Sequence, residues 1–91
     1  MKVTVNISGG FGAESIKNET LELNLEEGAT VKDLLKSVNS TYNTSVFSKG
    51  NMKSRLFVVM VNGTSIPPKN LKKTELASDD VISILQPIPG G

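Results

Sequence analysis

Apolar and polar residues alternate in two stretches near the start of the chain, KVTVNIS and ETLELNL. The apolar members are Val3, Val5 and Ile7 in the first stretch and Leu21, Leu23 and Leu25 in the second. A two-residue period is typical of a strand with one buried face. The intervening run GGFGAESIKN contains glycines and short polar residues that tolerate turn conformations. The pattern predicts a hairpin of two strands with a long loop.

The apolar spacing changes to that of a helix after the turn Glu26-Glu27-Gly28. In TVKDLLKSVNS, Thr30 can cap the first turn, and Asp33 occupies the reciprocal capping position. The apolar residues at helical spacing are Val31, Leu34, Leu35 and Val38. We therefore expect one amphipathic helix packed on the sheet. The polar stretch 39–51 predicts an irregular connection, with a short helical turn around Val46 and Phe47 and aromatic residues that tether it to the core.

The second half of the chain predicts further strands. RLFVVMVNG is short, apolar and rich in β-branched residues, as expected of a central strand covered on much of both faces. Asn62-Gly63 marks a tight turn, and Pro67-Pro68 opens a loop with apolar anchors at Leu71 and Leu76. Asp79-Asp80 is a turn before the last strand, VISILQ.

The order of these elements is β, β, α, β, short β, β, with the helix crossing between the first hairpin and the later strands. This order predicts an α+β fold of the β-grasp (ubiquitin-like) type, a mixed sheet of four to five strands with one main helix packed on one face. Ferredoxin-like and other small sandwiches are the alternatives.

The two strongest later strands carry apolar residues on both faces, although a sheet with one helix layer has a second face open to water. In VISILQ, Ile82 and Ile84 share one face, and Leu85 lies on the other. In the preceding strand, Met60 belongs to a similar second apolar row. Either loops cover this row or it forms a protein-binding patch, with Leu85 and Met60 as its expected members.

Composition limits the chemistry of this chain. Ninety-one residues suit one domain, and a net charge of +1 predicts no general attraction to nucleic acid or to a membrane surface. Cysteine and histidine are absent, which removes thiolate nucleophiles, Cys/His metal sites and the usual general base. The carboxylates, among them Asp33, Asp79 and Asp80, occupy positions expected of caps and turns. We expect no enzyme activity, no bound cofactor or metal and, without a signal peptide or membrane span, a cytoplasmic location.

Two local features have an alternative interpretation. SGGFG at positions 8–12 has no Gly-Lys-Ser/Thr sequence, so a hairpin loop is favoured over a phosphate-binding loop. The basic residues cluster as Lys69, Lys72 and Lys73, and as Lys49, Lys53 and Arg55. With few aromatic residues to stack on bases, a solvated face is favoured over a nucleic-acid site, and docking of an acidic partner protein stays open.

The chain ends in QPIPGG. Pro87 and Pro89 remove backbone donors and favour extended geometry, so residues 87–91 are predicted to form an extended tail beyond a domain of residues 1–86. Gly90 and Gly91 have no Cβ, so this tip can pass through a narrow channel and present its carboxylate. Activation of Gly91 by adenylation would allow attack by sulfur, giving a thiocarboxylate, or by a thiol and then a lysine amine, giving an isopeptide.

These features resemble the ubiquitin-like sulfur carriers and modifiers: the MoaD small subunit of molybdopterin synthase, the thiamine carrier ThiS, the ubiquitin-related modifier and the small archaeal modifier proteins. The resemblance covers nearly the whole chain and is carried by KVTVNISGG, TVKDLL, the VNG turn and SDDVISILQPIPGG. Gln86, where a first proline is common, and Pro89 beside the glycines depart from the usual small-subunit ending.

The resemblance implies that Gly91 is the transferred carboxyl, that Gly90 is a spacer fitting the partner's channel beyond Pro87, Ile88 and Pro89, and that Leu85 is an exposed apolar contact. It also implies an ATP-dependent activating enzyme of the MoeB/ThiF type, which consumes the ATP. Further partners would be the large subunit of molybdopterin synthase, for a sulfur carrier, or lysine-bearing target proteins, for a protein modifier. A plain binding module is the third possibility.

Overall fold

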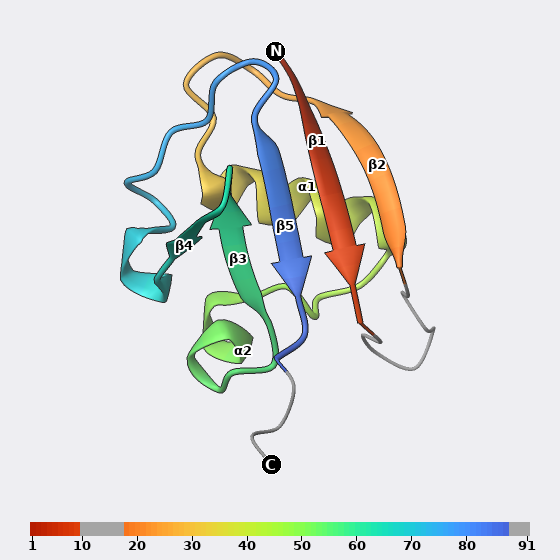
Figure 1. The fold of residues 1–91 in the computed structure, drawn as a ribbon, viewed down its shortest axis with the longest axis vertical. Helices are drawn as coiled ribbons and strands as arrows, with labels where there is room; N and C mark the ends of the chain where they lie inside the picture. The colour runs from red at the N-terminus through yellow and green to blue at the C-terminus, as the bar shows by residue number, and fades with distance from the viewer. Residues whose placement is uncertain (10–17, 88–91) are drawn as a thin grey trace.

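The computed structural model describes residues 1–9 and 18–87 of the chain. One sheet contains five strands in the order β2-β1-β5-β3-β4. The strands are β1 (Lys2–Ser8), β2 (Glu19–Asn24), β3 (Val58–Val61), β4 (Thr64–Ile66) and β5 (Val81–Leu85). The predicted α+β arrangement, a mixed sheet with one main helix, is confirmed (Figure 1).

Strand β5 lies in the middle of the sheet, between the two parts of the chain that precede it. It pairs in parallel with β1, from Thr4 opposite Val81 to Ser8 opposite Leu85. It pairs antiparallel with β3, with Val58 opposite Leu85. The RLFVVMVNG stretch contains β3, an interior strand that is shorter than the apolar run. The central position of the sheet belongs to β5.

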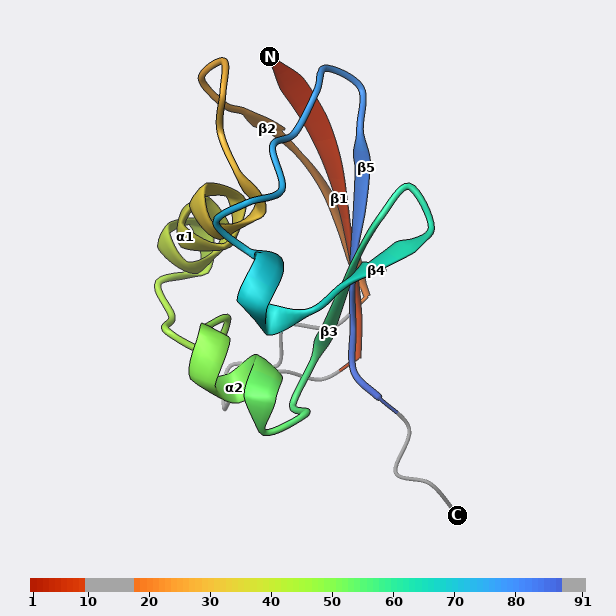
Figure 2. The same ribbon diagram turned by 90° about the vertical axis from the view of Figure 1, so that its left-hand side faces the viewer.

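Helix α1 (Val31–Tyr42) crosses one face of the sheet, as Figure 2 shows. Its predicted capping box is present: the Asp33 N–H donates to the Thr30 hydroxyl, and the Thr30 N–H donates to the Asp33 carboxylate at 2.9 Å. The helix ends at Asn43, whose left-handed backbone accommodates the turn away from the axis. The helix's apolar stripe, Val31, Leu34, Leu35 and Val38, is buried.

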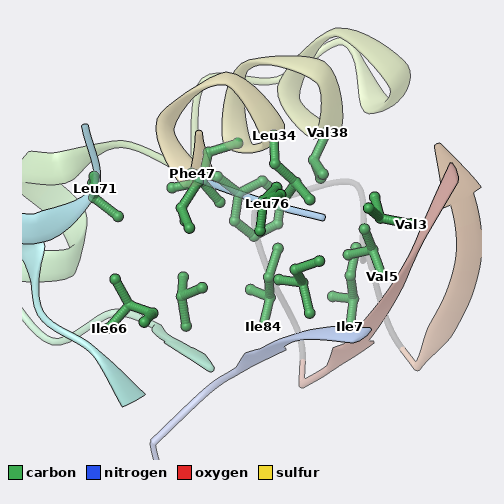
Figure 3. Close-up of a cluster of buried hydrophobic side chains, with 14 of the residues drawn as sticks. Val3, Val5, Ile7, Leu34, Val38, Phe47, Ile66, Leu71, Leu76 and Ile84 are labelled. Carbon is green, nitrogen blue, oxygen red and sulfur yellow. The ribbon is translucent and has the colours of Figure 1, made fainter. Parts of the chain in front are cut away.

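The core lies between α1 and the sheet (Figure 3). Alternate residues of β1 and β5 point into it, as the two-residue period predicted. The predicted loop anchors Leu71 and Leu76 are also buried in this core. One face of the sheet therefore provides most of the apolar burial that stabilises the fold.

The short helix after α1 lies further along the chain than predicted. It is α2 (Lys49–Lys53), capped by the Ser48 hydroxyl, whereas Val46 and Phe47 are not helical. The Asn39 side chain exchanges two hydrogen bonds of 3.0 Å with the backbone of Phe47, and these bonds replace those of a helical turn. Phe47 is buried edge-on against Phe57, so the predicted aromatic tether is confirmed there.

Two turns complete the scaffold. Asn62 and Gly63 both have positive φ, as expected of the predicted tight turn between β3 and β4. A single turn of 3₁₀ helix, η1 (Pro68–Asn70), follows the proline pair. At the start of β5, the Asp80 carboxylate accepts hydrogen bonds from the Ala77 N–H and the Asn62 side chain, which fixes the turn around Asp79.

Candidate functional site

The predicted tail begins where β5 leaves the sheet. Pro87 is the last residue that the structure describes, and it is partly exposed. The other predicted tail residues, Ile88, Pro89, Gly90 and Gly91, lie outside the described residues. The site that can be built from the structure is therefore the base of the tail and the surface around it.

Strand pairing places the base of the tail at one end of the sheet. Because β1 and β5 are parallel, both finish at the same end, and Ser8 lies opposite Leu85. The N–H of Gln86 donates to the carbonyl of Ser8 at 3.0 Å, so the backbone is held by the sheet until the residue before Pro87. The chain passes out of the middle of the sheet at the end away from the N-terminus (Figure 1).

Gly9 makes this exit possible, a role that sequence reasoning missed. Its φ of +123° is a conformation that other residues rarely adopt, and a Cβ there would lie 2.5 Å from the Cβ of Gln86. Its N–H donates to the Asn18 side chain at 3.3 Å. The SGGFG motif was interpreted only as a hairpin loop, but its first glycine also lets β1 end beside the base of the tail.

The predicted patch residues lie on the face of the sheet opposite α1. Leu85 and Met60 point to this face and are partly exposed, as is Val58, which pairs directly with Leu85. Met60 pairs with Ser83, so it is a diagonal neighbour of Leu85. We call Val58, Met60 and Leu85 the open-face patch.

No segment of the described chain packs over the open-face patch (Figure 2). The sequence left open whether loops cover this apolar row or whether it forms a protein-binding patch. The described loops do not cover it. Two exposed apolar side chains flank it: Leu56, two residues before Val58, is 50% exposed, and Val81 at the other end of β5 is 39% exposed. Apolar side chains that gather on an exposed face are a feature of protein-binding surfaces.

The open face is not apolar throughout. Over β1 and β2 it carries polar and charged residues, including an ion pair between Lys2 and Glu22 at 3.3 Å and a hydrogen bond from Thr20 to the Asn6 side chain. The apolar half thus lies over β3 and β5, with a polar border over β1 and β2. This division would orient a partner along the strand that leads into the tail.

Two titratable groups with shifted pKa values, Asp33 and Tyr42, take part in structural contacts. The backbone and hydroxyl hydrogen bonds of Thr30 lower the pKa of Asp33 below its ordinary value. Partial burial raises the pKa of Tyr42, helped by the nearby Glu19 carboxylate. Within residues 1–9 and 18–87, no three acidic, cysteine or histidine residues gather as they would to hold a metal ion.

The fold brings together some members of the two predicted basic clusters and leaves the others apart. Lys49, Lys69 and Lys72 line one groove on the helix side of the sheet, whereas Lys53, Arg55 and Lys73 are exposed elsewhere. In the described part of the chain, no helix is both long and apolar enough to cross a membrane.

A mixed five-stranded sheet of this order, crossed by one helix and ending in its middle strand, defines a ubiquitin-like β-grasp protein. The model of the ThiS family matches residues 11–91, and the chain belongs to the ThiS family. The family match confirms the predicted resemblance to the ubiquitin-like sulfur carriers and modifiers.

Solved structures agree over the whole chain. SAMP1 from Haloferax volcanii has a TM-score of 0.70 at 19% identity, covering 100% of both chains. The putative molybdopterin converting factor subunit 1 from Pyrococcus furiosus has a TM-score of 0.69 at 26% identity, covering 96% of this chain and 98% of that one. A chain in the complex of subunits 1 and 2 of molybdopterin-converting factor from Helicobacter pylori has a TM-score of 0.62 at 26% identity, covering 100% of both. No curated protein sequence matches.

Proposed function

We propose that this protein is a ubiquitin-like sulfur carrier that is adenylated and thiocarboxylated at Gly91 and donates its sulfur in molybdopterin biosynthesis. The observation that carries the proposal is the ThiS family match, which extends over the last strand and the Gly-Gly tail. The likeness to molybdopterin converting factor subunit 1, at 26% identity over nearly the full chain, supports this biosynthetic role.

The chemistry requires only an accessible terminal carboxylate from this chain. A carboxylate oxygen of Gly91 attacks the α-phosphate of ATP, and pyrophosphate leaves to give the acyl-adenylate. Hydrosulfide then attacks the carbonyl carbon and AMP leaves with the attached carboxylate oxygen, giving the thiocarboxylate. If a persulfide attacks instead, the resulting acyl disulfide is cleaved to the thiocarboxylate by a second thiol, which is oxidised to a disulfide. Both steps take place on the activating enzyme, which binds the ATP, so this chain acts as carrier and contributes no catalytic residue.

In this proposal, the folded domain holds the start of the tail in place, and the tail presents the reactive carboxylate. The Gln86–Ser8 hydrogen bond and the parallel pairing with β1 hold the start of the tail at the end of the sheet. Pro87, Ile88 and Pro89 would keep the tail extended, and Gly90 would fit the partner's channel. The open-face patch would be the contact surface for the activating enzyme and for the synthase large subunit.

The alternative product is an isopeptide, in which Gly91 is joined to lysines of target proteins through the same acyl-adenylate. The intact mass of the protein from its native cells, with the C-terminal peptide resolved, distinguishes the two. We expect a species in which sulfur replaces one oxygen at Gly91. An unmodified terminus with Gly-Gly remnants on lysines of other proteins would instead indicate a modifier, and the absence of both would indicate a plain binding module.

The partner surface has its own test. Leu85→Ser should weaken binding to the activating enzyme by about tenfold or more, because it removes an apolar contact at the centre of the open-face patch. Glu22→Ser, on the polar border of the same face, is the matched control and should change the affinity by less than about twofold. Titration calorimetry with the activating enzyme measures both. Equal effects of the two substitutions would contradict the assignment of this patch.

A further inference from the structure

A groove on the helix side of the protein concentrates positive charge. It is bounded by α1, by the segment that leads into α2, and by η1, and it has a volume of about 430 Å³. These three segments lie on the same side of the sheet (Figure 2), and α2 contacts η1. Five lysines line the groove: Lys32, Lys36, Lys49, Lys69 and Lys72. We call it the lysine groove.

Among the described residues, no lysine of the groove has a carboxylate within ion-pair distance. The described chain contains one ion pair, Lys2–Glu22, and it lies on the open face. The lysine groove therefore holds half of the ten Lys and Arg residues without pairing any of them with a carboxylate. The Lys72 ammonium is the main reason that the pKa of Lys32 is lowered, followed by desolvation and by Lys36, while the Asp33 carboxylate acts in the opposite direction. Like charges held together in this way would be relieved by an anionic ligand.

The floor of the lysine groove is apolar. It includes Leu35 from α1, Phe47 from the connection and Leu71 after η1, all of them largely buried. Five lysines in the lining of a groove that also has apolar residues fit a ligand that combines negative charge with an apolar side chain. An acidic protein segment with an apolar residue near its centre has this chemistry.

Nucleic acid fits the same groove less well. Binding of single strands relies on aromatic side chains that stack on bases. The one aromatic residue of the lining, Phe47, is 2% exposed and packs edge-on against Phe57. The floor therefore offers no aromatic face on which a base could stack.

We infer that the lysine groove is a docking site for a short acidic segment of a partner protein, with an apolar side chain seated on the floor. The site is separate from the open-face patch, since the core and the sheet lie between the groove on the helix side and the patch on the opposite face. It therefore goes beyond the proposed carrier function and does not depend on activation of Gly91. It would allow one partner to hold the helix side while another engages the tail.

The test uses the full chain and a fluorescein-labelled peptide with one central leucine flanked on both sides by glutamates. Fluorescence anisotropy at low salt should show binding that weakens by about tenfold or more when salt is raised to about 0.5 M. Replacing the central leucine by serine should weaken binding, and replacing the glutamates by glutamines should abolish it. In amide NMR spectra, the shifts should fall on residues 32–39, 47–49 and 68–72.

Charge reversal provides the matched control. The double variant Lys32→Glu/Lys72→Glu should lower the affinity by about tenfold or more, because both ammonium groups line the groove. Lys53→Glu/Lys73→Glu makes the same change in net charge at exposed lysines outside the groove and should change the affinity by less than about threefold. A thermal melt of each variant shows that the fold is kept.

Four outcomes would overturn the inference. The first is no detectable peptide binding at low salt, and the second is an equal loss in the two double variants. The third is tighter binding of single-stranded RNA at the same amides, which would assign the groove to nucleic acid. The fourth is self-association that Lys32→Glu/Lys72→Glu abolishes, which would make the acidic turn of a second copy, around Glu26 and Glu27, the occupant.

Discussion

The middle strand of this protein presents two different surfaces. On the helix side, Ile82 and Ile84 of β5 are fully buried in the core. On the open side, Val81, Ser83 and Leu85 of the same strand retain exposure, and Leu85 lies beside the point where the chain leaves the sheet. A single strand thus contributes to stability through one face and carries the candidate interaction surface on the other. The two roles can be altered separately because successive side chains of a strand point to opposite faces.

The largest expected effect comes from substituting neighbouring residues of β5. Ile84→Ala should lower the free energy of unfolding by about 2–5 kcal/mol, because it leaves a cavity in a fully packed core. Leu85→Ala, one residue further on, should lower it by about 1 kcal/mol or less, because the side chain is already partly exposed. Urea denaturation measures both. Equal losses would show that the open face contributes to the fold as much as the core does.

Gly9, at the base of the tail, tests whether the exit of the chain depends on close packing against β1. Gly9→Ala should lower the free energy of unfolding by about 2–3 kcal/mol, because it combines a left-handed backbone with a clash against Gln86. Gly63 is the matched control: it also has positive φ, but no atom lies within 4 Å of a Cβ there. Gly63→Ala should lose about 1 kcal/mol from backbone strain alone. In amide NMR spectra, only Gly9→Ala should shift the resonance of Gln86. An unchanged Gln86 resonance in Gly9→Ala would show that Gly9 does not position the exit of the chain.

The start of α1 should respond to both substitution and pH. Thr30→Ala should lower the free energy of unfolding by about 1 kcal/mol through loss of the cap. The pKa of Asp33 is lowered in the folded protein by hydrogen bonds from Thr30. Its stabilising contribution is therefore complete above its ordinary value of 3.8 and is lost as the pH falls through the lowered folded-state pKa.

Thermal melts between pH 6 and pH 2 measure this dependence. Asp33→Asn, which cannot ionise, should show a smaller decline in melting temperature over this range than the unaltered protein. An identical decline in both proteins would show that other carboxylates control the acid sensitivity.

The smallest expected effect on stability is at the terminus. Deletion of Gly91 should leave the melting temperature nearly unchanged, because chain termini contribute little to packing. The same deletion should abolish thiocarboxylate formation, because the activated carboxyl group would then belong to Gly90. Calorimetry and intact mass after incubation with the activating enzyme and ATP measure the two quantities. Retained thiocarboxylation would contradict the specific role of Gly91, and a large loss of stability would contradict the separation of tail and fold.

Local patterns predicted most of the scaffold. The alternation in KVTVNIS and the helical spacing after Thr30 gave elements at nearly their observed positions, because a strand and a helix each bury one periodic face. The connection between α1 and β3 was predicted less well. Its short helix begins at Lys49 after the Ser48 cap, whereas Phe47 is held outside the helix by the Asn39 side chain, an interaction between residues eight positions apart that no local pattern reveals.

Some residues of the candidate site could be predicted from the sequence, and others only from the structure. Leu85 and Met60 could be assigned to one face from alternation alone, whereas Val58, the direct partner of Leu85, required the register between β3 and β5. Neither the role of Gly9 nor the lysine groove could be seen in the sequence. The lysines come from three separate segments, and the basic clusters predicted from sequence combined groove residues with others that lie outside it.

The sequence by itself determined the periodic elements, their order, the apolar character of both faces of the last strand, and a Gly-Gly pair preceded by Pro87 and Pro89. Each of these depends on neighbouring residues and on backbone chemistry that is local to them. Only the tertiary structure decided that β5 lies in the middle of the sheet, that Gly9 accommodates Gln86, and that the five lysines share one groove. These features depend on strand pairing and packing between distant segments, which fix positions that local conformational preferences leave open.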